Sequence, residues 1–168
     1  MTEENQAAAA QEQKPEVQFA LQRVYLKDLS FESPQGVKAF TTQAKPKVNQ
    51  ELNTKTAKIE DNLYEVALRL TVTVADGEET LYLVEVEQAG LFAVSGLEDQ
   101  QLAQVLNTAC PNILFPYARE AIDNTLTKAT FPPLLLPPIN FDALFASAVQ
   151  QAQQKAQAEG EAETETAH

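Results

Sequence analysis

Apolar and polar residues alternate with a period of two through residues 62–92, which predicts two half-buried β-strands. The apolar face of the first strand runs through residues 64–74, and that of the second through residues 82–86. Asp76-Gly77 separates the two runs and predicts a β-hairpin. Matching the two apolar faces favours a three-residue loop over residues 75–77, with Gly77 in the left-handed conformation.

That loop sets which side chains oppose each other on the second face of the hairpin. It aligns Leu70 with Tyr82 and places Glu65 opposite Glu87, so that two carboxylates meet directly. Opposed like charges cost stability in a sheet. A solvated face is the simpler interpretation, and a face that presents acidic groups to a partner is the alternative.

Two further strands are expected to join the hairpin. Residues 17–32 alternate over fifteen or so positions, and the odd positions make the more apolar face, so Asp28 and Glu32 lie on the acidic face. Residues 33–46 contain two prolines and a glycine and read as a long crossover loop. A weaker strand over residues 47–58 completes a four-stranded antiparallel sheet.

Helical spacing dominates the second half of the chain. Residues 98–109 predict a helix that ends or kinks at Cys110-Pro111, and Asn112 is expected to cap a second helix that runs to Lys128 with Pro116 in its first turn. Four prolines in residues 131–139 predict an extended segment, and Asn140 is expected to cap a last helix. The fold class is therefore α+β, with long helices packed on one face of the sheet.

Charge and composition exclude several classes of partner. The net charge of −12 includes −7 on the body of the chain, which argues against binding nucleic acid or an anionic membrane surface. We expect no membrane insertion, no signal peptide and, with one cysteine, a reducing cytoplasmic setting. The expected domains are a disordered arm over residues 1–14, a single domain over 15–150 and a flexible acidic tail over 151–168.

Residues that could carry out catalysis are scarce. His168 is the sole histidine and ends the expected tail, so it cannot serve a nucleophile as a base. Cys110 is expected to be a packed small residue, and neither a metal-ligand cluster nor a phosphate-binding loop is present in the sequence. We therefore expect no enzyme and no cofactor. Apolar residues in the proline-rich segment cannot all turn inward, which suggests an oligomer interface or a peptide-binding surface.

The stretch Cys110–Glu120, CPNILFPYARE, resembles the signature of the SecB family of export chaperones. The stretches that agree in order are residues 23–32, 64–74, 77–80, 130–136 and 140–145. The resemblance implies a homotetramer built as a dimer of dimers. It also implies ATP-independent binding of unfolded secretory preproteins and their delivery to the translocation ATPase SecA, whose own ATP cycle would drive release.

The resemblance also implies three sets of site residues. The positions for docking SecA are Asp28, Glu32, Leu83 and Glu85. The oligomer contacts are Val84, Val86 and Gln88. The candidates for an apolar client groove are Phe40, Val48, Leu52, Phe115, Phe131, Leu134 and Leu136. Ala44 stands where family members often have a tryptophan, which leaves one wall of that groove undefined.

Two other functions remain open at this point. One is a SecB-like chaperone dedicated to a toxin–antitoxin system, which would fail to bind SecA. The other is a structural oligomer without client binding, which would not slow the aggregation of any unfolded protein.

Overall fold

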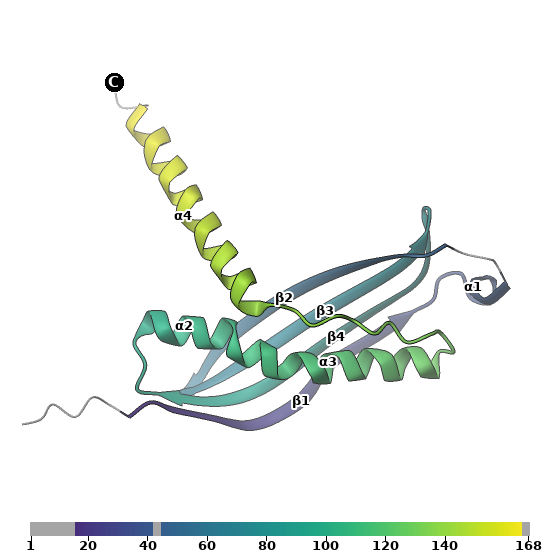
Figure 1. Cartoon of the computed structure of the whole chain (residues 1–168), viewed down its shortest axis with the longest axis horizontal. Helices are drawn as coiled ribbons and strands as arrows, with labels where there is room; N and C mark the ends of the chain where they lie inside the picture. The colour runs from purple at the N-terminus through teal and green to yellow at the C-terminus, as the bar shows by residue number, and fades with distance from the viewer. Residues whose placement is uncertain (1–15, 42–44, 166–168) are drawn as a thin grey trace, which may run out of the picture.

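Four strands and four helices make up the computed structural model, which describes residues 16–41 and 45–165. In chain order they are β1 (Gln18–Glu32), α1 (Lys38–Thr41), β2 (Lys47–Glu60), β3 (Leu63–Asp76), β4 (Glu79–Ser95), α2 (Asp99–Asn107), α3 (Ala109–Lys128) and α4 (Phe141–Glu165). The strands form one antiparallel sheet in the order β1-β4-β3-β2. Helices α2 and α3 cover one face of this sheet, and α4 projects away from it (Figure 1). The predicted α+β class, with four antiparallel strands and helices, is confirmed.

The core lies between α3 and the two central strands. Every second residue of β3 and β4 turns toward the helices, and the side chains of Leu68, Val72 and Val84 are fully buried there. Gly90 lets α3 approach β4 closely, because a Cβ at this position would lie 3.0 Å from the Leu114 side chain. The period-two pattern of the sequence thus describes the core face of the central strands.

The register of the hairpin differs from the predicted one. Val74 pairs with Tyr82 and Leu70 pairs with Val86, so the strands are offset by four residues from the expected alignment. The strands continue to Asp76 and Glu79, and a register shift beside Ala75 absorbs one extra residue and restores the match of the two apolar faces. The sequence therefore predicted correctly which residues face the core. It predicted wrongly which residues oppose each other across the hairpin. Gly77 is left-handed, with φ of +61°, as expected.

Two β-bulges correct the predicted faces of β1. Register shifts occur between Leu21 and Arg23 and between Leu26 and Asp28. Each bulge inserts one residue and reverses which side chains face the helices. Leu26 therefore pairs with Gln88 on the helix side, whereas Asp28 pairs with Glu87 on the opposite face. The strict odd-position pattern was wrong in the middle of the strand, although the placement of Asp28 was correct.

The second long helix begins earlier than predicted. Helix α3 starts at Ala109 after Thr108, so Pro111 lies in its first turn, where its missing N–H costs nothing, and Pro116 lies inside the helix. Asn140 does cap α4, because its Oδ1 accepts a 3.0 Å hydrogen bond from the Ala143 backbone N–H. Helix α4 continues to Glu165, well beyond the brief extension that the sequence suggested.

Some sequence-based expectations lie outside the described residues. These are the disordered arm over residues 1–14, the substitution at Ala44 and the isolated histidine His168. Within residues 16–41 and 45–165, no helix is both long enough and apolar enough to cross a membrane.

Candidate functional site

The residues expected to dock a partner lie together on the outer face, by which we mean the face of the sheet opposite α2 and α3. In the register of β1 and β4, Glu32 is beside Leu83, Ser30 is beside Glu85 and Asp28 is beside Glu87. Adjacent strands lie about 4.8 Å apart, so Asp28, Glu32, Leu83 and Glu85 occupy neighbouring positions. The sequence phasing that assigned these four residues to one face is consistent with this geometry.

An arginine divides the acidic groups of the outer face. Arg69 lies directly opposite Glu87 across β3 and β4, and its guanidinium forms a salt bridge with that carboxylate. Its Nη1 is 3.4 Å from Glu85 Oε1. The predicted opposition of Glu65 and Glu87 is therefore wrong: Glu65 opposes Leu91, because the hairpin register is shifted. Opposite charges now lie side by side, which removes the cost that the sequence had indicated.

Glu65 has its own partners on the edge strand β1. Tyr25 donates a hydrogen bond to Glu65 Oε1, and Lys27 Nζ is 2.9 Å from Oε2. Ala89 of β4 lies directly beside Tyr25, and its small side chain leaves room for Tyr25 and Glu65 to meet above β4. The Tyr25 hydrogen bond and then Lys27 lower the pKa of Glu65, and burial together with Glu65 raises the pKa of Tyr25 to about 12.

The acidic groups of the outer face therefore fall into two sets. Glu65 and Glu87 have side chains that are 18% and 9% exposed and are paired with cations of the same face. Asp28 and Glu32 are exposed at the edge strand, and Glu85 is 27% exposed. Asp28, Glu32 and Glu85 are therefore the more exposed carboxylates on β1 and β4, and Glu51 of β2 adds another exposed carboxylate on the same face.

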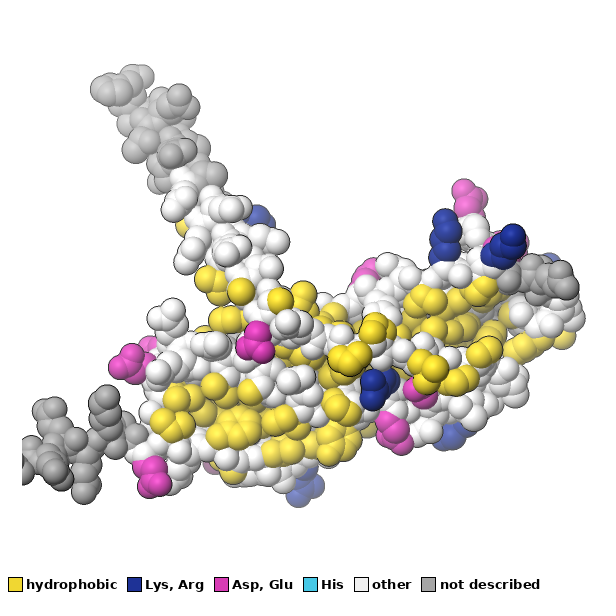
Figure 2. Space-filling view, in the orientation of Figure 1, with side chains coloured by type: hydrophobic (Ala, Val, Ile, Leu, Met, Phe, Trp, Pro, Cys, Tyr) yellow, Lys and Arg dark blue, Asp and Glu magenta, His cyan; other side chains and the backbone are white. Residues whose placement is uncertain are grey.

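A cluster of aromatic rings lies on the other face, under the crossover between β1 and β2. The Phe131 ring is 4.6 Å from Tyr82, 5.0 Å from Phe40 and 6.1 Å from Phe31, measured between ring centroids. We call these four residues the crossover cluster. Phe40 belongs to the short helix α1 and is 53% exposed. Figure 2 shows hydrophobic side chains gathered over the strands near this end of the molecule.

Sequence reasoning identified two of the four rings of the crossover cluster. Phe31 and Tyr82 were not among the predicted groove residues, although both are aromatic residues on the core face of their strands. Finding them requires the pairing of β1 with β4. In that register Phe31 pairs with Val84, which brings Phe31 near Tyr82.

Two of the predicted client-binding residues are core residues. Phe115 is 5% exposed and packs edge-on against Phe141, and Leu136 is 3% exposed. Their assignment to an open groove is corrected, because neither side chain has surface to offer in this conformation. In the proline-rich segment it is Leu135 that points outward, with a positive φ of 47° and 77% exposure.

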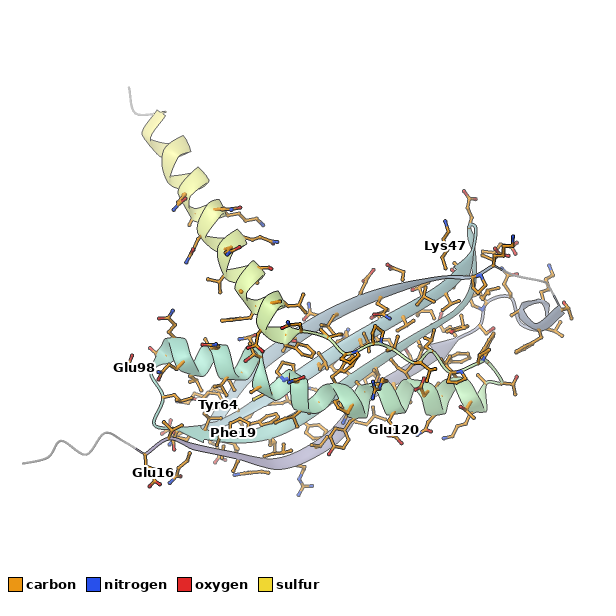
Figure 3. All side chains as sticks on the ribbon, viewed as in Figure 1. Glu16, Phe19, Lys47, Tyr64, Glu98 and Glu120 are labelled. Atoms are coloured by element: carbon orange, nitrogen blue, oxygen red, sulfur yellow. The ribbon has the colours of Figure 1, made fainter. Side chains whose placement is uncertain are left out.

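The remaining candidates border accessible surface. Val48 is 48% exposed near the start of β2, where Lys47 is labelled in Figure 3, and Leu134 is half-buried. Leu52 lines a separate cavity of about 290 Å³ with Leu144 and Phe145 of α4. Among the predicted groove residues, Phe40 and Phe131 therefore belong to the crossover cluster, and Leu52 lines a separate cavity at α4.

Hydrogen bonds from α3 hold the segment between α3 and α4 in place. The Leu134 backbone N–H donates to Asp123 Oδ1 over 3.2 Å, and Arg119 Nη1 donates to the Leu136 carbonyl over 3.3 Å. Figure 1 shows this segment running back along α3 without regular secondary structure, as its four prolines predict. The segment that follows Phe131 is thus tied to the helix layer.

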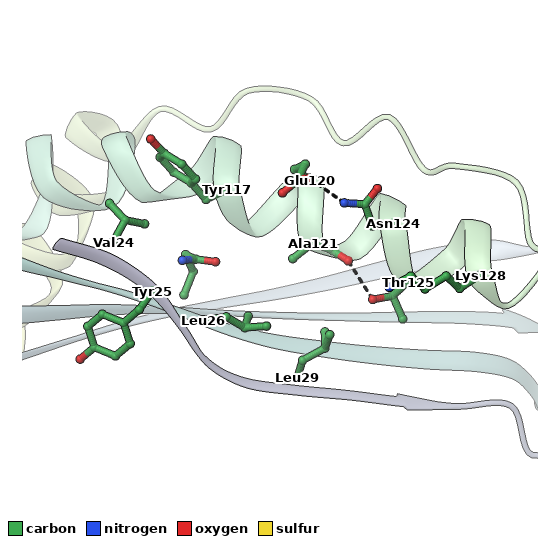
Figure 4. A pocket seen from close by; sticks show the side chains of 11 residues that line it. Val24, Tyr25, Leu26, Leu29, Tyr117, Glu120, Ala121, Asn124, Thr125 and Lys128 are labelled. Carbon is green, nitrogen blue, oxygen red and sulfur yellow. Dashed lines mark hydrogen bonds between the residues drawn. The ribbon is translucent and has the colours of Figure 1, made fainter.

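The three predicted oligomer-contact residues are buried within the one chain. Val84 and Val86 are 0% exposed and Gln88 is 4% exposed. Gln88 also lines a cavity of about 370 Å³ between β1 and α3. Leu26, Leu29 and Tyr117 border this cavity and are 39–48% exposed, and Figure 4 shows them on its opposite walls. The open apolar surface near the predicted contacts therefore belongs to β1 and α3.

Cys110 has the inert environment that its sequence context predicted. It is fully buried in the first turn of α3, and burial raises the pKa of its thiol to about 12. A thiol with so high a pKa is not a nucleophile at neutral pH.

Comparisons with known proteins place this arrangement in a family. The family model described as "Preprotein translocase subunit SecB" matches residues 10–152. The chain belongs to the SecB family. The protein-export protein SecB of Cellvibrio japonicus is 55% identical over 159 residues, which cover 95% of each chain. That of Marinobacter nauticus is 54% identical over 165 residues, which cover 98% of this chain and 99% of the relative.

A solved structure supports the same fold. The SecB-like chaperone of Mycobacterium tuberculosis, in complex with an antitoxin peptide, superposes with a TM-score of 0.59 at 16% identity, over 73% of this chain and 91% of that one. At this identity the likeness concerns the fold. Membership in the SecB family makes this chain a preprotein-export chaperone and not an enzyme.

Proposed function

We propose that this export chaperone holds unfolded preproteins in an apolar groove at the crossover cluster and passes them to SecA through the outer face. The observation that carries the proposal is the separation of the two surfaces. Apolar rings gather on the helix side of the sheet, and exposed carboxylates gather on the other side. A client and a motor protein can therefore be bound at the same time.

The groove suits clients of many sequences. Phe40, Val48, Phe131 and Leu134 offer partly exposed apolar surface. Burial of apolar surface is non-directional and contributes about 25 cal/mol per Å². Binding of this kind therefore does not require a particular client sequence. Leu52 and the cavity beside α4 would extend the contact along an unfolded chain. Release would require the ATP cycle of the motor.

The outer face suits a basic partner. Asp28, Glu32 and Glu85 supply carboxylates, and Leu83 supplies a half-buried apolar contact among them. Complementary charge speeds association and makes it sensitive to salt. The body of the chain carries a net charge of −7, which would add to steering at long range.

We also propose a cytoplasmic homotetramer, built as a dimer of dimers. Strand β1 is an edge of the sheet, and its exposed apolar residues Leu26 and Leu29 face Tyr117 of α3 across an open cavity. An exposed edge strand with apolar side chains is prone to pair with another chain. Gln88, at the base of this cavity, is the one predicted contact residue that such an interface would meet. Val84 and Val86 would support it from within the core.

Charge reversal at the outer face tests the docking proposal. Asp28→Lys should weaken binding to SecA by about tenfold at low salt, because an attraction of about 0.5–1 kcal/mol becomes a repulsion of similar size. Glu78→Lys in the hairpin turn makes the same change in net charge away from the docking residues and is the matched control. Capture of an unfolded preprotein and the mass of the assembly, from light scattering, should not change. Equal SecA affinity for Asp28→Lys and Glu78→Lys would refute the docking assignment.

A further inference from the structure

Glu85 is the one carboxylate of the proposed docking surface that the protein itself holds in a fixed direction. Thr71 lies directly opposite it on β3, and the Thr71 hydroxyl donates a 2.8 Å hydrogen bond to Glu85 Oε2. Arg69 approaches the other oxygen, Oε1, at 3.4 Å. Both contacts pull the carboxylate toward β3 and away from the edge strand β1.

The two contacts differ in what they do when a basic partner arrives. Arg69 brings a positive charge, so it competes with an incoming lysine or arginine for Oε1. The Thr71 hydroxyl is neutral and uses a single lone pair of the carboxylate, which can accept about four hydrogen bonds. The Thr71 bond can therefore persist in the complex, while the partner takes the place of Arg69.

A second observation explains why Arg69 can release Glu85. The guanidinium is also paired with Glu87, whose side chain is only 9% exposed. Because Glu87 is buried beside it, Arg69 keeps a charged partner when Glu85 turns to another cation. Arg69 also lines a surface cavity of about 290 Å³ with Thr71 and the charged residues Glu85, Glu51 and Lys55, and this cavity provides space for an incoming side chain.

We propose that Thr71 is a positioning residue for the docking of SecA, which orients Glu85 toward this cavity before the partner binds. The inference rests on the proposed docking function of the outer face. Ordering a glutamate side chain at an interface costs conformational entropy, and a hydrogen bond that orders it beforehand lowers that cost. Thr71 acts through Glu85 and need not touch the partner.

The test removes the hydroxyl while keeping the shape of the side chain. Thr71→Val should weaken SecA binding by about three- to tenfold, measured by titration calorimetry with the full-length assembly. Thr71→Ser keeps the hydroxyl and should restore the affinity. Thr73→Val makes the same substitution two residues along the same face, beside Leu83, and should leave SecA affinity within about twofold.

A double-mutant cycle separates this inference from the docking proposal. Glu85→Ala should weaken SecA binding, and Thr71→Val should then have no further effect in the Glu85→Ala protein, because Thr71 would have nothing left to orient. If Glu85→Ala binds SecA as the unaltered protein does, the docking proposal itself fails. If Glu85→Ala weakens binding but Thr71→Val does not, or if Thr71→Val weakens it equally without Glu85, the role of Thr71 is refuted. Capture of an unfolded preprotein should be the same for every variant.

Discussion

Phe40 offers a sharp test of the client groove, because its ring is half exposed and its loss should disturb little else. The side chain is 53% exposed, and within the crossover cluster it packs against Phe131. Its removal forfeits one aromatic pair, worth about 0.5–1.5 kcal/mol. Phe131 is a poorer probe, since its ring packs against three others and its truncation should cost about 3 kcal/mol of folding stability.

The size of the expected effect follows from the exposed area of Phe40. An aromatic side chain buries about 150–250 Å² when fully covered, so a client that covers the exposed half would remove roughly 100 Å² from water. At about 25 cal/mol per Å², this contact would contribute about 2.5 kcal/mol to client binding. Phe40→Ala should therefore raise the dissociation constant for an unfolded preprotein by up to about sixtyfold.

The assay compares Phe40→Ala with a variant of matched exposure. Ile59 is 51% exposed but lies near the far end of β2, so Ile59→Ala removes similar apolar surface away from the crossover. Binding of a fluorescently labelled, unfolded preprotein would be measured by anisotropy, with suppression of its aggregation as a second readout. If the two variants bind the client equally well, and circular dichroism shows both to be folded, the groove does not lie at Phe40.

Three further predictions follow from the core and the outer face. Gly90→Ala should lower the free energy of unfolding by about 1–3 kcal/mol, measured by urea denaturation, because a Cβ there would lie 2.8 Å from the Phe92 ring and 3.0 Å from the Leu114 side chain; an unchanged midpoint would contradict the close packing around Gly90. Tyr25→Phe should destabilise the protein at pH values above the ordinary pKa of a glutamate carboxyl, and the destabilisation should become smaller as the pH falls. Because the pKa of Glu65 is lowered in the folded protein, the stability that its hydrogen bond with Tyr25 contributes is present when Glu65 is ionised and is lost when Glu65 is protonated. A stability difference between Tyr25→Phe and the unaltered protein that grows toward pH 3 would refute this. Cys110 should react with a thiol reagent only as fast as the protein unfolds, and rapid labelling of the native protein at pH 7 would show that the thiol is accessible.

Local patterns in the sequence determined the elements and their buried faces. The alternation in residues 64–74 identified the core face of β3, because side chains of a strand point alternately to opposite sides. The four prolines of residues 131–139 excluded a helix or a central strand, because proline lacks an amide hydrogen. The signature from Cys110 to Glu120 indicated the family and, through it, the function. None of these conclusions needed contacts between distant residues.

The tertiary structure alone decided which residues meet. A register shift of four residues keeps every core side chain on its proper face, so hydrophobic patterning cannot detect it, yet it moves Arg69 from Leu83 to Glu87. That shift turns an apparently repulsive face into a paired one and brings Thr71 opposite Glu85. Likewise, Leu135 is exposed and its neighbour Leu136 is buried, although both belong to the proline-rich segment. Their exposure depends on how the chain lies against α3. Periodicity determines the face of a side chain, whereas its neighbour across the sheet depends on turns and bulges that the pattern does not encode.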